Sequence, residues 1–70
     1  MTMSAIAIWR KGGLSATIYI DGKRAGSIPV PACVERVESS GPVIYLYGKT
    51  ICYLYDCSSG YPRNMPSLYI

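Results

Sequence analysis

The side chains of this sequence that could do chemistry favour binding over catalysis. Histidine, the commonest general base of enzymes, is absent, so neither a Ser–His nor a Cys–His pair can form. Among the four carboxylates, only Asp56 stands beside a thiol, that of Cys57, and a negative neighbour disfavours a reactive thiolate. We therefore expect that the protein is not an enzyme and that it carries no cofactor.

Basic residues occur beside glycines in segments that are typical of turns. The backbone N–H groups of such turns can form a concave site for an anion. If the first and third turns lie at the same end of the sheet, their cations come together and could hold a phosphate group. The candidate phosphate-binding residues of the three basic turns are Arg10, Lys11, Gly12, Gly13, Lys23, Arg24 and Lys49.

Tyrosine is abundant, with seven residues, whereas phenylalanine is absent. Tyrosine is enriched at protein interfaces because its ring is apolar and its hydroxyl tolerates water. The alternative is that tyrosine replaces phenylalanine in the core, and we favour that interpretation for Tyr53. The candidate partner-binding residues are Tyr45, Tyr47, Tyr61 and Arg63.

The three cysteines favour free thiols over a metal site. Cys33, Cys52 and Cys57 are too few and too widely spaced for structural zinc, and no histidine completes a ligand set. An odd number of cysteines with no recognisable signal peptide is typical of a reducing compartment. We expect buried, inert thiols, no metal and a cytoplasmic location.

The elements that position these residues are short strands. Asp21-Gly22 separates two β-prone segments and predicts a tight hairpin between 14–20 and 23–28. In a simple register, Ile28 would face away from the aliphatic side, so we predict a bulge near Ala25-Gly26 that turns it back.

The segment 32–40 is ambiguous. Val34 and Val37 share a face at helical spacing, and Gly41-Pro42 is a typical end of a helix, so we predict a short helix here. The alternative is a poorly alternating strand.

A second hairpin is predicted around Gly48-Lys49, with Tyr47 opposite Thr50. Its core face would carry Ile44, Leu46, Ile51 and Tyr53, and the remaining face would carry Val43, Tyr45, Tyr47, Thr50, Cys52 and Leu54. The residues 57–70 are loop-rich, with a short last strand at 67–70.

Together these features predict one small domain, residues 1–70, of the β-rich α+β class. We expect an antiparallel meander or half-barrel of about five strands with one short helix after the third strand. A chain of this length buries only about 60% of its unfolded surface, and half of its residues are apolar, so a homodimer is also expected.

The leading functional hypothesis is a small intracellular inhibitor that docks a protein partner through a face bearing Tyr and Arg. Its size and its lack of catalytic sets would suit a phage or mobile-element protein that blocks a bacterial defence enzyme. The first alternative is an oligomer that sequesters a nucleotide or phosphorylated small molecule at the basic turns. The second is single-stranded nucleic-acid binding, for which a net charge of +3 is low. No apolar run is long enough to predict a membrane span.

Overall fold

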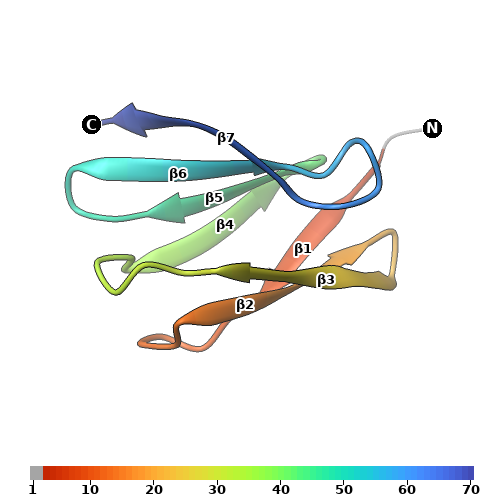
Figure 1. The fold of residues 1–70 in the computed structure, drawn as a ribbon, viewed down its shortest axis with the longest axis horizontal. Helices are drawn as coiled ribbons and strands as arrows, with labels where there is room; N and C mark the ends of the chain where they lie inside the picture. The colour runs from red at the N-terminus through yellow and green to blue at the C-terminus, as the bar shows by residue number, and fades with distance from the viewer. Residues whose placement is uncertain (1–2) are drawn as a thin grey trace.

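Seven strands form two antiparallel sheets in the computed structural model, which describes residues 3–70 (Figure 1). The first sheet contains β1 (Ala5–Ile8), β2 (Ser15–Ile20) and β3 (Lys23–Pro29) in that order. The second contains β4 (Arg36–Ser40), β5 (Val43–Tyr47), β6 (Ile51–Asp56) and β7 (Arg63–Tyr69), also in sequence order. Each sheet is a meander, so the predicted antiparallel β-rich class is confirmed, although the strands outnumber the expected five.

The first hairpin has the predicted turn and the predicted bulge. Ile20 pairs with Lys23 across Asp21-Gly22, and the register then shifts so that Ile18 pairs with Gly26. The extra residue restores Ile28 to the core side, where it is only 3% exposed. The bulge therefore places the Ile28 side chain in the core.

The predicted helix after the third strand is wrong. Residues 36–40 form β4, which pairs along its whole length with β5, from Arg36 opposite Tyr47 to Ser40 opposite Val43. Gly41, with φ +57°, belongs to the turn of this hairpin and does not end a helix. In an extended chain Val37 faces inward opposite Leu46, and Arg36 and Glu38 face outward, so pairing with β5 decides between two weak periodicities.

The β5–β6 hairpin has the predicted faces but a register displaced by two residues. Tyr47 lies opposite Cys52 instead of Thr50, and Gly48 donates from its N–H to the carbonyl of Ile51 at 2.8 Å. The turn is therefore Lys49-Thr50, and the φ of Gly48 is not positive as a type II′ turn would require. A displacement of two leaves every side chain on its predicted face, because strands alternate with a period of two.

The loop-rich segment 57–70 contains more strand than expected. β7 begins at Arg63, not near residue 67, and pairs with β6 through an irregularity between Cys52 and Leu54. Pro66 lies within β7, which is an edge strand, and an edge is where a sheet tolerates a residue without an N–H.

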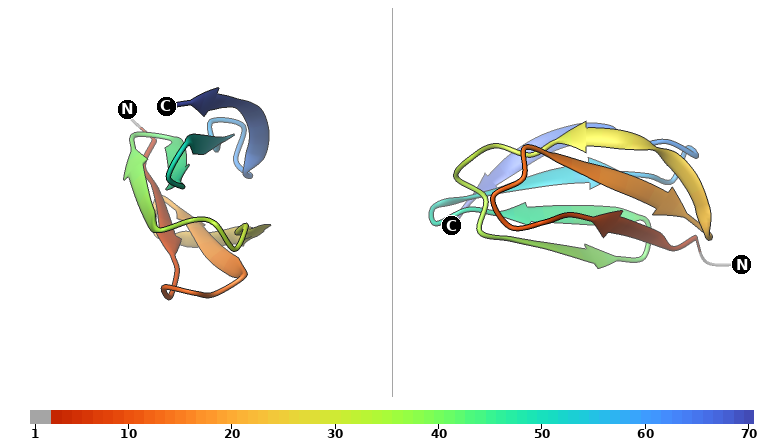
Figure 2. Two further views of the ribbon diagram at one scale, coloured as in Figure 1. Left: turned by 90° about the vertical axis from the view of Figure 1, so that its left-hand side faces the viewer. Right: turned by 90° about the horizontal axis from the view of Figure 1, so that it is seen from below.

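The core lies between the two sheets. Figure 2 shows them end-on, close together beside β1 and β4 and diverging toward β3 and β7. The Ala5 N–H donates to the Gly41 carbonyl at 2.8 Å, which ties β1 to the β4–β5 turn. Within residues 3–70, no helix is long and apolar enough to cross a membrane. The buried core residues are Ala5, Ala16, Ile18, Ile20, Ile28, Val30, Val34, Ile44, Leu46 and Cys57.

Candidate functional site

The outer face of the second sheet points away from the core and carries two of the predicted partner-binding tyrosines. Because Ile44 and Leu46 of β5 are buried inward, Tyr45 and Tyr47 face outward and are half-buried. We call this surface the tyrosine face. Its rows across β4, β5, β6 and β7 are Arg36, Tyr47, Cys52 and Leu68; Glu38, Tyr45, Leu54 and Met65; and Ser40, Val43, Asp56 and Arg63.

An aromatic stack with a cationic cap lies on this face. The rings of Tyr45 and Tyr47 are stacked, with centroids 6.0 Å apart and planes 16° apart. The Arg36 guanidinium carbon lies 4.4 Å from the centroid of Tyr47, a cation–π contact, and its Nε lies 2.9 Å from Oε2 of Glu38. Both rings are held in place before any partner arrives.

The centre of the face is apolar. Cys52 is only 3% exposed although its position in β6 places it on this face, in the row between Tyr47 and Leu68. Leu54 is half-buried, whereas Met65 and Leu68 on the edge strand are 41% and 57% exposed. In the described part of the chain, no element packs over these residues.

The other two predicted partner-binding residues lie at the border of the tyrosine face. Arg63 is exposed in β7 opposite Asp56, and Tyr61 is 56% exposed in the preceding loop. The Asp56 carboxylate accepts hydrogen bonds from the Ser58 N–H at 3.0 Å and the Ser58 hydroxyl at 2.9 Å. Arg63 makes no ion pair with any residue from 3 to 70, so its guanidinium is free to meet a carboxylate from outside.

A hollow of about 290 Å³ opens at the end of the tyrosine face, beside the β5–β6 turn. It lies next to the ring of Tyr47 and is bordered by cations. Such a hollow can receive one anchoring side chain of a partner. Its lining residues are Glu35, Arg36, Tyr47, Gly48, Lys49 and Ile70.

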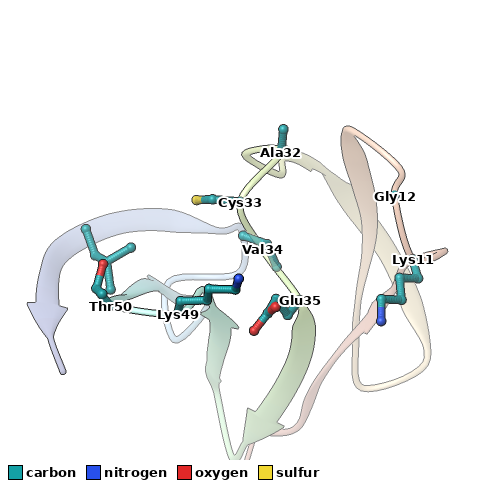
Figure 3. A pocket seen from close by; sticks show the side chains of 9 residues that line it. Lys11, Gly12, Ala32, Cys33, Val34, Glu35, Lys49 and Thr50 are labelled. Carbon is teal, nitrogen blue, oxygen red and sulfur yellow. The ribbon is translucent and has the colours of Figure 1, made fainter.

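A larger cavity of about 520 Å³ lies at the same end of the molecule, and we call it the end cavity. Figure 3 shows that the β1–β2 turn, the β3–β4 loop and the β5–β6 turn surround it. The lining residues are Lys11, Gly12, Ala32, Cys33, Val34, Glu35, Lys49, Thr50 and Ile51.

The structure brings part of the predicted phosphate site together and leaves part of it elsewhere. Lys11, Gly12 and Lys49 all line the end cavity, and Arg10 and Gly13 lie in the same turn without lining it. Lys23 and Arg24 begin β3 at the opposite end of the molecule (Figure 1), because an odd number of strands separates their turn from the other two. In a single chain, the predicted phosphate-binding residues therefore form two separate groups.

Some of the site was missed at the level of sequence. The segment 32–35 lines the end cavity, but the sequence pattern predicted that this segment would begin a helix. Arg36 was not singled out, although it caps Tyr47. Reading 36–40 as a strand opposite 43–47 would have revealed that contact, since residues directly opposite each other in a sheet touch.

The thiols differ in exposure. Cys52 and Cys57 are buried, as expected, whereas Cys33 is exposed, so the expectation of a buried thiol is wrong there. Burial raises the pKa of both buried thiols, and the nearby Asp56 carboxylate raises that of Cys57 further. The Cys33 sulfur lies 3.9 Å from the Tyr53 hydroxyl, and this contact is the main cause of a raised Tyr53 pKa.

The arrangement offers two candidate binding surfaces. Among residues 3–70, no three Cys, Asp or Glu side chains gather as a metal ion would require. Comparison of the chain with models of protein families, with curated proteins and with solved structures finds no match.

Proposed function

We propose that this chain is a protein-interaction domain that docks a partner protein through the tyrosine face. The observation that carries the proposal is the Tyr45–Tyr47 stack, capped by Arg36, on a sheet face that no described element covers. Tyrosine and arginine are over-represented among the residues that dominate binding energy at interfaces. A stack that is ordered in the free chain also loses little side-chain entropy on binding.

The layout of the face matches that of a protein interface. Apolar residues occupy its middle and extend onto the edge strand β7 at Met65 and Leu68. Charged residues border them on β4, at Arg36 and Glu38, and in the row of Arg63 at the other end of β7. An apolar centre inside a polar rim is the usual anatomy of such surfaces.

The charges favour a protein partner over a nucleic acid. Arg36 is already paired with Glu38, and Asp56 is on the face with Arg63, so the face has no excess of cations to neutralise phosphates. On this face, the guanidinium of Arg63 has no ion-pair partner among residues 3–70 and calls for a single carboxylate. The partner that fits is therefore a protein with an exposed apolar patch bordered by Asp or Glu.

The narrower form of this proposal is a cytoplasmic inhibitor, phage-encoded or carried by a mobile element, that occludes a bacterial defence enzyme. Its support is the tyrosine face, which spans all four strands of the second sheet and could cover part of an enzyme's surface. In that form, the captured partner is an enzyme whose activity falls on binding.

The test compares two tyrosine variants of the full chain. Immobilised wild type, Tyr45→Ala/Tyr47→Ala and Tyr19→Ala are exposed to a lysate of cells that naturally contain the protein, and the retained protein is then purified and titrated by calorimetry. Tyr19 is the matched control, since it is half-buried on the outer face of the first sheet. We expect the double variant to bind on the order of 30-fold more weakly, as for the loss of a dominant contact, and Tyr19→Ala to bind like wild type.

Two outcomes would contradict the proposal. One is retention of the same protein, with the same affinity, by the double variant. The other is a wild-type dimer in analytical ultracentrifugation that the double variant abolishes, which would assign the face to a second copy. Arg63→Glu separates binding from folding, because this exposed side chain makes no ion pair with any residue from 3 to 70. The variant should bind the partner more weakly without a change in the thermal midpoint of unfolding.

A further inference from the structure

We infer that the end cavity binds a small phosphate ester with a hydroxyl-bearing organic body, of about the size of a mononucleotide. This site adjoins the tyrosine face, because Glu35 and Lys49 also line the hollow at the end of that face, but Lys11 and Gly12 belong to the end cavity alone. Its volume of about 520 Å³ lies within the usual range of small-molecule sites, roughly 300–1,000 Å³.

The cations of the cavity are free to bind an anion. Lys11 and Lys49 come from different sheets, and Figure 3 shows them on opposite sides of Glu35. Neither ammonium lies within 4 Å of a carboxylate in residues 3–70, where the only ion pair joins Arg36 to Glu38. Either unpaired ammonium is therefore available to hydrogen-bond the oxygens of a phosphate group that enters the hollow.

The other lining groups specify the rest of the ligand. Ala32, Val34 and Ile51 supply an apolar wall, which suits a carbon skeleton and gives inorganic phosphate nothing to contact. Glu35 would repel a second anionic group but accept hydrogen bonds from hydroxyls or amines. The cavity thus favours a molecule with one anionic end and one hydrogen-bond-donating end.

The three segments around the cavity are fixed by hydrogen bonds. Gly13 donates to the Arg10 carbonyl at 2.7 Å, and the Trp9 indole N–H donates to the Gly13 carbonyl at 2.9 Å, which holds the β1–β2 turn. The Glu35 N–H donates to the Tyr47 carbonyl at 2.7 Å, which ties the β3–β4 loop to the second sheet.

The β3–β4 loop and the β5–β6 turn lie close together at a glycine. A Cβ on Gly48 would lie 3.4 Å from the carbonyl oxygen of Cys33, so little space separates the two segments there. The cavity therefore exists before a ligand enters, and binding orders little of the backbone.

The test titrates the full, isotope-labelled chain with AMP and glucose 6-phosphate, and with adenosine, glucose and inorganic phosphate as comparisons. We expect at least one ester to saturate and to move the amide resonances of Gly12, Val34 and Thr50. Its unphosphorylated counterpart and inorganic phosphate should each bind on the order of tenfold more weakly, and added salt should weaken the binding of the ester.

Substitutions then assign the site. Lys11→Gln and Lys49→Gln should each weaken binding of the ester on the order of tenfold. Lys23→Gln, which changes an exposed lysine at the opposite end, should leave the affinity for the ester unchanged. Lys11→Gln leaves the tyrosine face intact, and Tyr47→Ala leaves the cavity lining intact, so failure of this site and failure of the docking face are distinguishable. The inference is overturned if neither ester saturates at about 10 mM, if inorganic phosphate or the neutral compounds bind equally well, or if the shifts centre on Lys23 and Arg24.

Discussion

The three thiols have different surroundings, and their reactivity should differ accordingly. Cys33 is exposed at the end cavity, whereas Cys52 and Cys57 are 3% and 0% exposed. Because only an accessible thiolate attacks an electrophile, iodoacetamide at pH 8 should modify Cys33 quickly and the other two only after unfolding. Mass spectrometry of peptides from the time course measures this, and equal labelling of Cys57 and Cys33 in the folded protein would contradict the burial described above.

Stability should fall at alkaline pH because of the buried thiols. Burial raises the pKa of Cys52 and Cys57 above the ordinary value of 9.0, so the folded state keeps these protons longer than the unfolded state does. Their contribution is therefore complete below about pH 9 and is lost as the pH rises through the higher pKa of the folded state. Urea unfolding between pH 7 and 10.5 should show a declining free energy of unfolding above pH 9.

A cysteine-to-alanine comparison isolates the cause of that decline, since tyrosines also ionise in this range. The free energy of unfolding of Cys57→Ala should fall less steeply above pH 9 than that of the wild type, although the smaller side chain lowers stability at every pH. Cys33→Ala, at an exposed position, should keep the wild-type profile. Parallel pH profiles for the wild type and Cys57→Ala would show that this thiol does not contribute.

At the level of elements, the bulge in β3 depends on one backbone conformation. Gly26 has φ +126°, a region that residues with a side chain rarely adopt, while a Cβ built there meets no atom within 4 Å. Gly26→Ala should therefore cost about 1–3 kcal/mol from backbone strain alone. Chemical denaturation measures the change, with exposed Ser27→Ala in the same strand as the control. Equal stabilities of the two variants would show that the bulge is not held by glycine.

The hairpins also show how far local sequence determines these elements. Asp21-Gly22 determines its turn almost by itself, because the positive φ of both residues suits few other pairs. Gly48-Lys49 misleads, because Gly48 does not adopt the positive φ of a type II′ turn and instead lies against the Cys33 carbonyl of another loop. The segment 36–40 misleads for the same reason: β5 beside it decides that it is a strand. Turns made by their own residues could be predicted, and choices made by distant neighbours could not.

For the molecule as a whole, the two candidate surfaces differ in how much the sequence could reveal. Tyr45 and Tyr47 are two residues apart in one strand, so their shared face follows from alternation alone. Lys11, Glu35 and Lys49 line one cavity only because one meander packs on the other in a particular way, and no local sequence pattern specifies that packing. The sequence could suggest that these turns share an end, but not that a cavity lies between them.

The two sheets should unfold as one cooperative unit, because neither has a core of its own. Ile18 of the first sheet and Ile44 of the second are both fully buried and belong to the same cluster. Each substitution by valine should cost about 0.5–1.5 kcal/mol, and either one should reduce amide protection in both sheets by the same factor. Ile8→Val, at a position that is 60% exposed, should change neither quantity appreciably.

Hydrogen exchange followed by mass spectrometry distinguishes this from independent sheets. If the first sheet opened alone, Ile18→Val would accelerate exchange in β1–β3 and leave β5 and β6 protected. The shared cluster argues against this, since an open first sheet would expose Ile44 and Leu46 to water and remove the apolar contacts that the second sheet needs. Binding at either surface should therefore protect amides throughout the molecule, because a ligand of the folded state raises the free energy of the only available unfolding reaction.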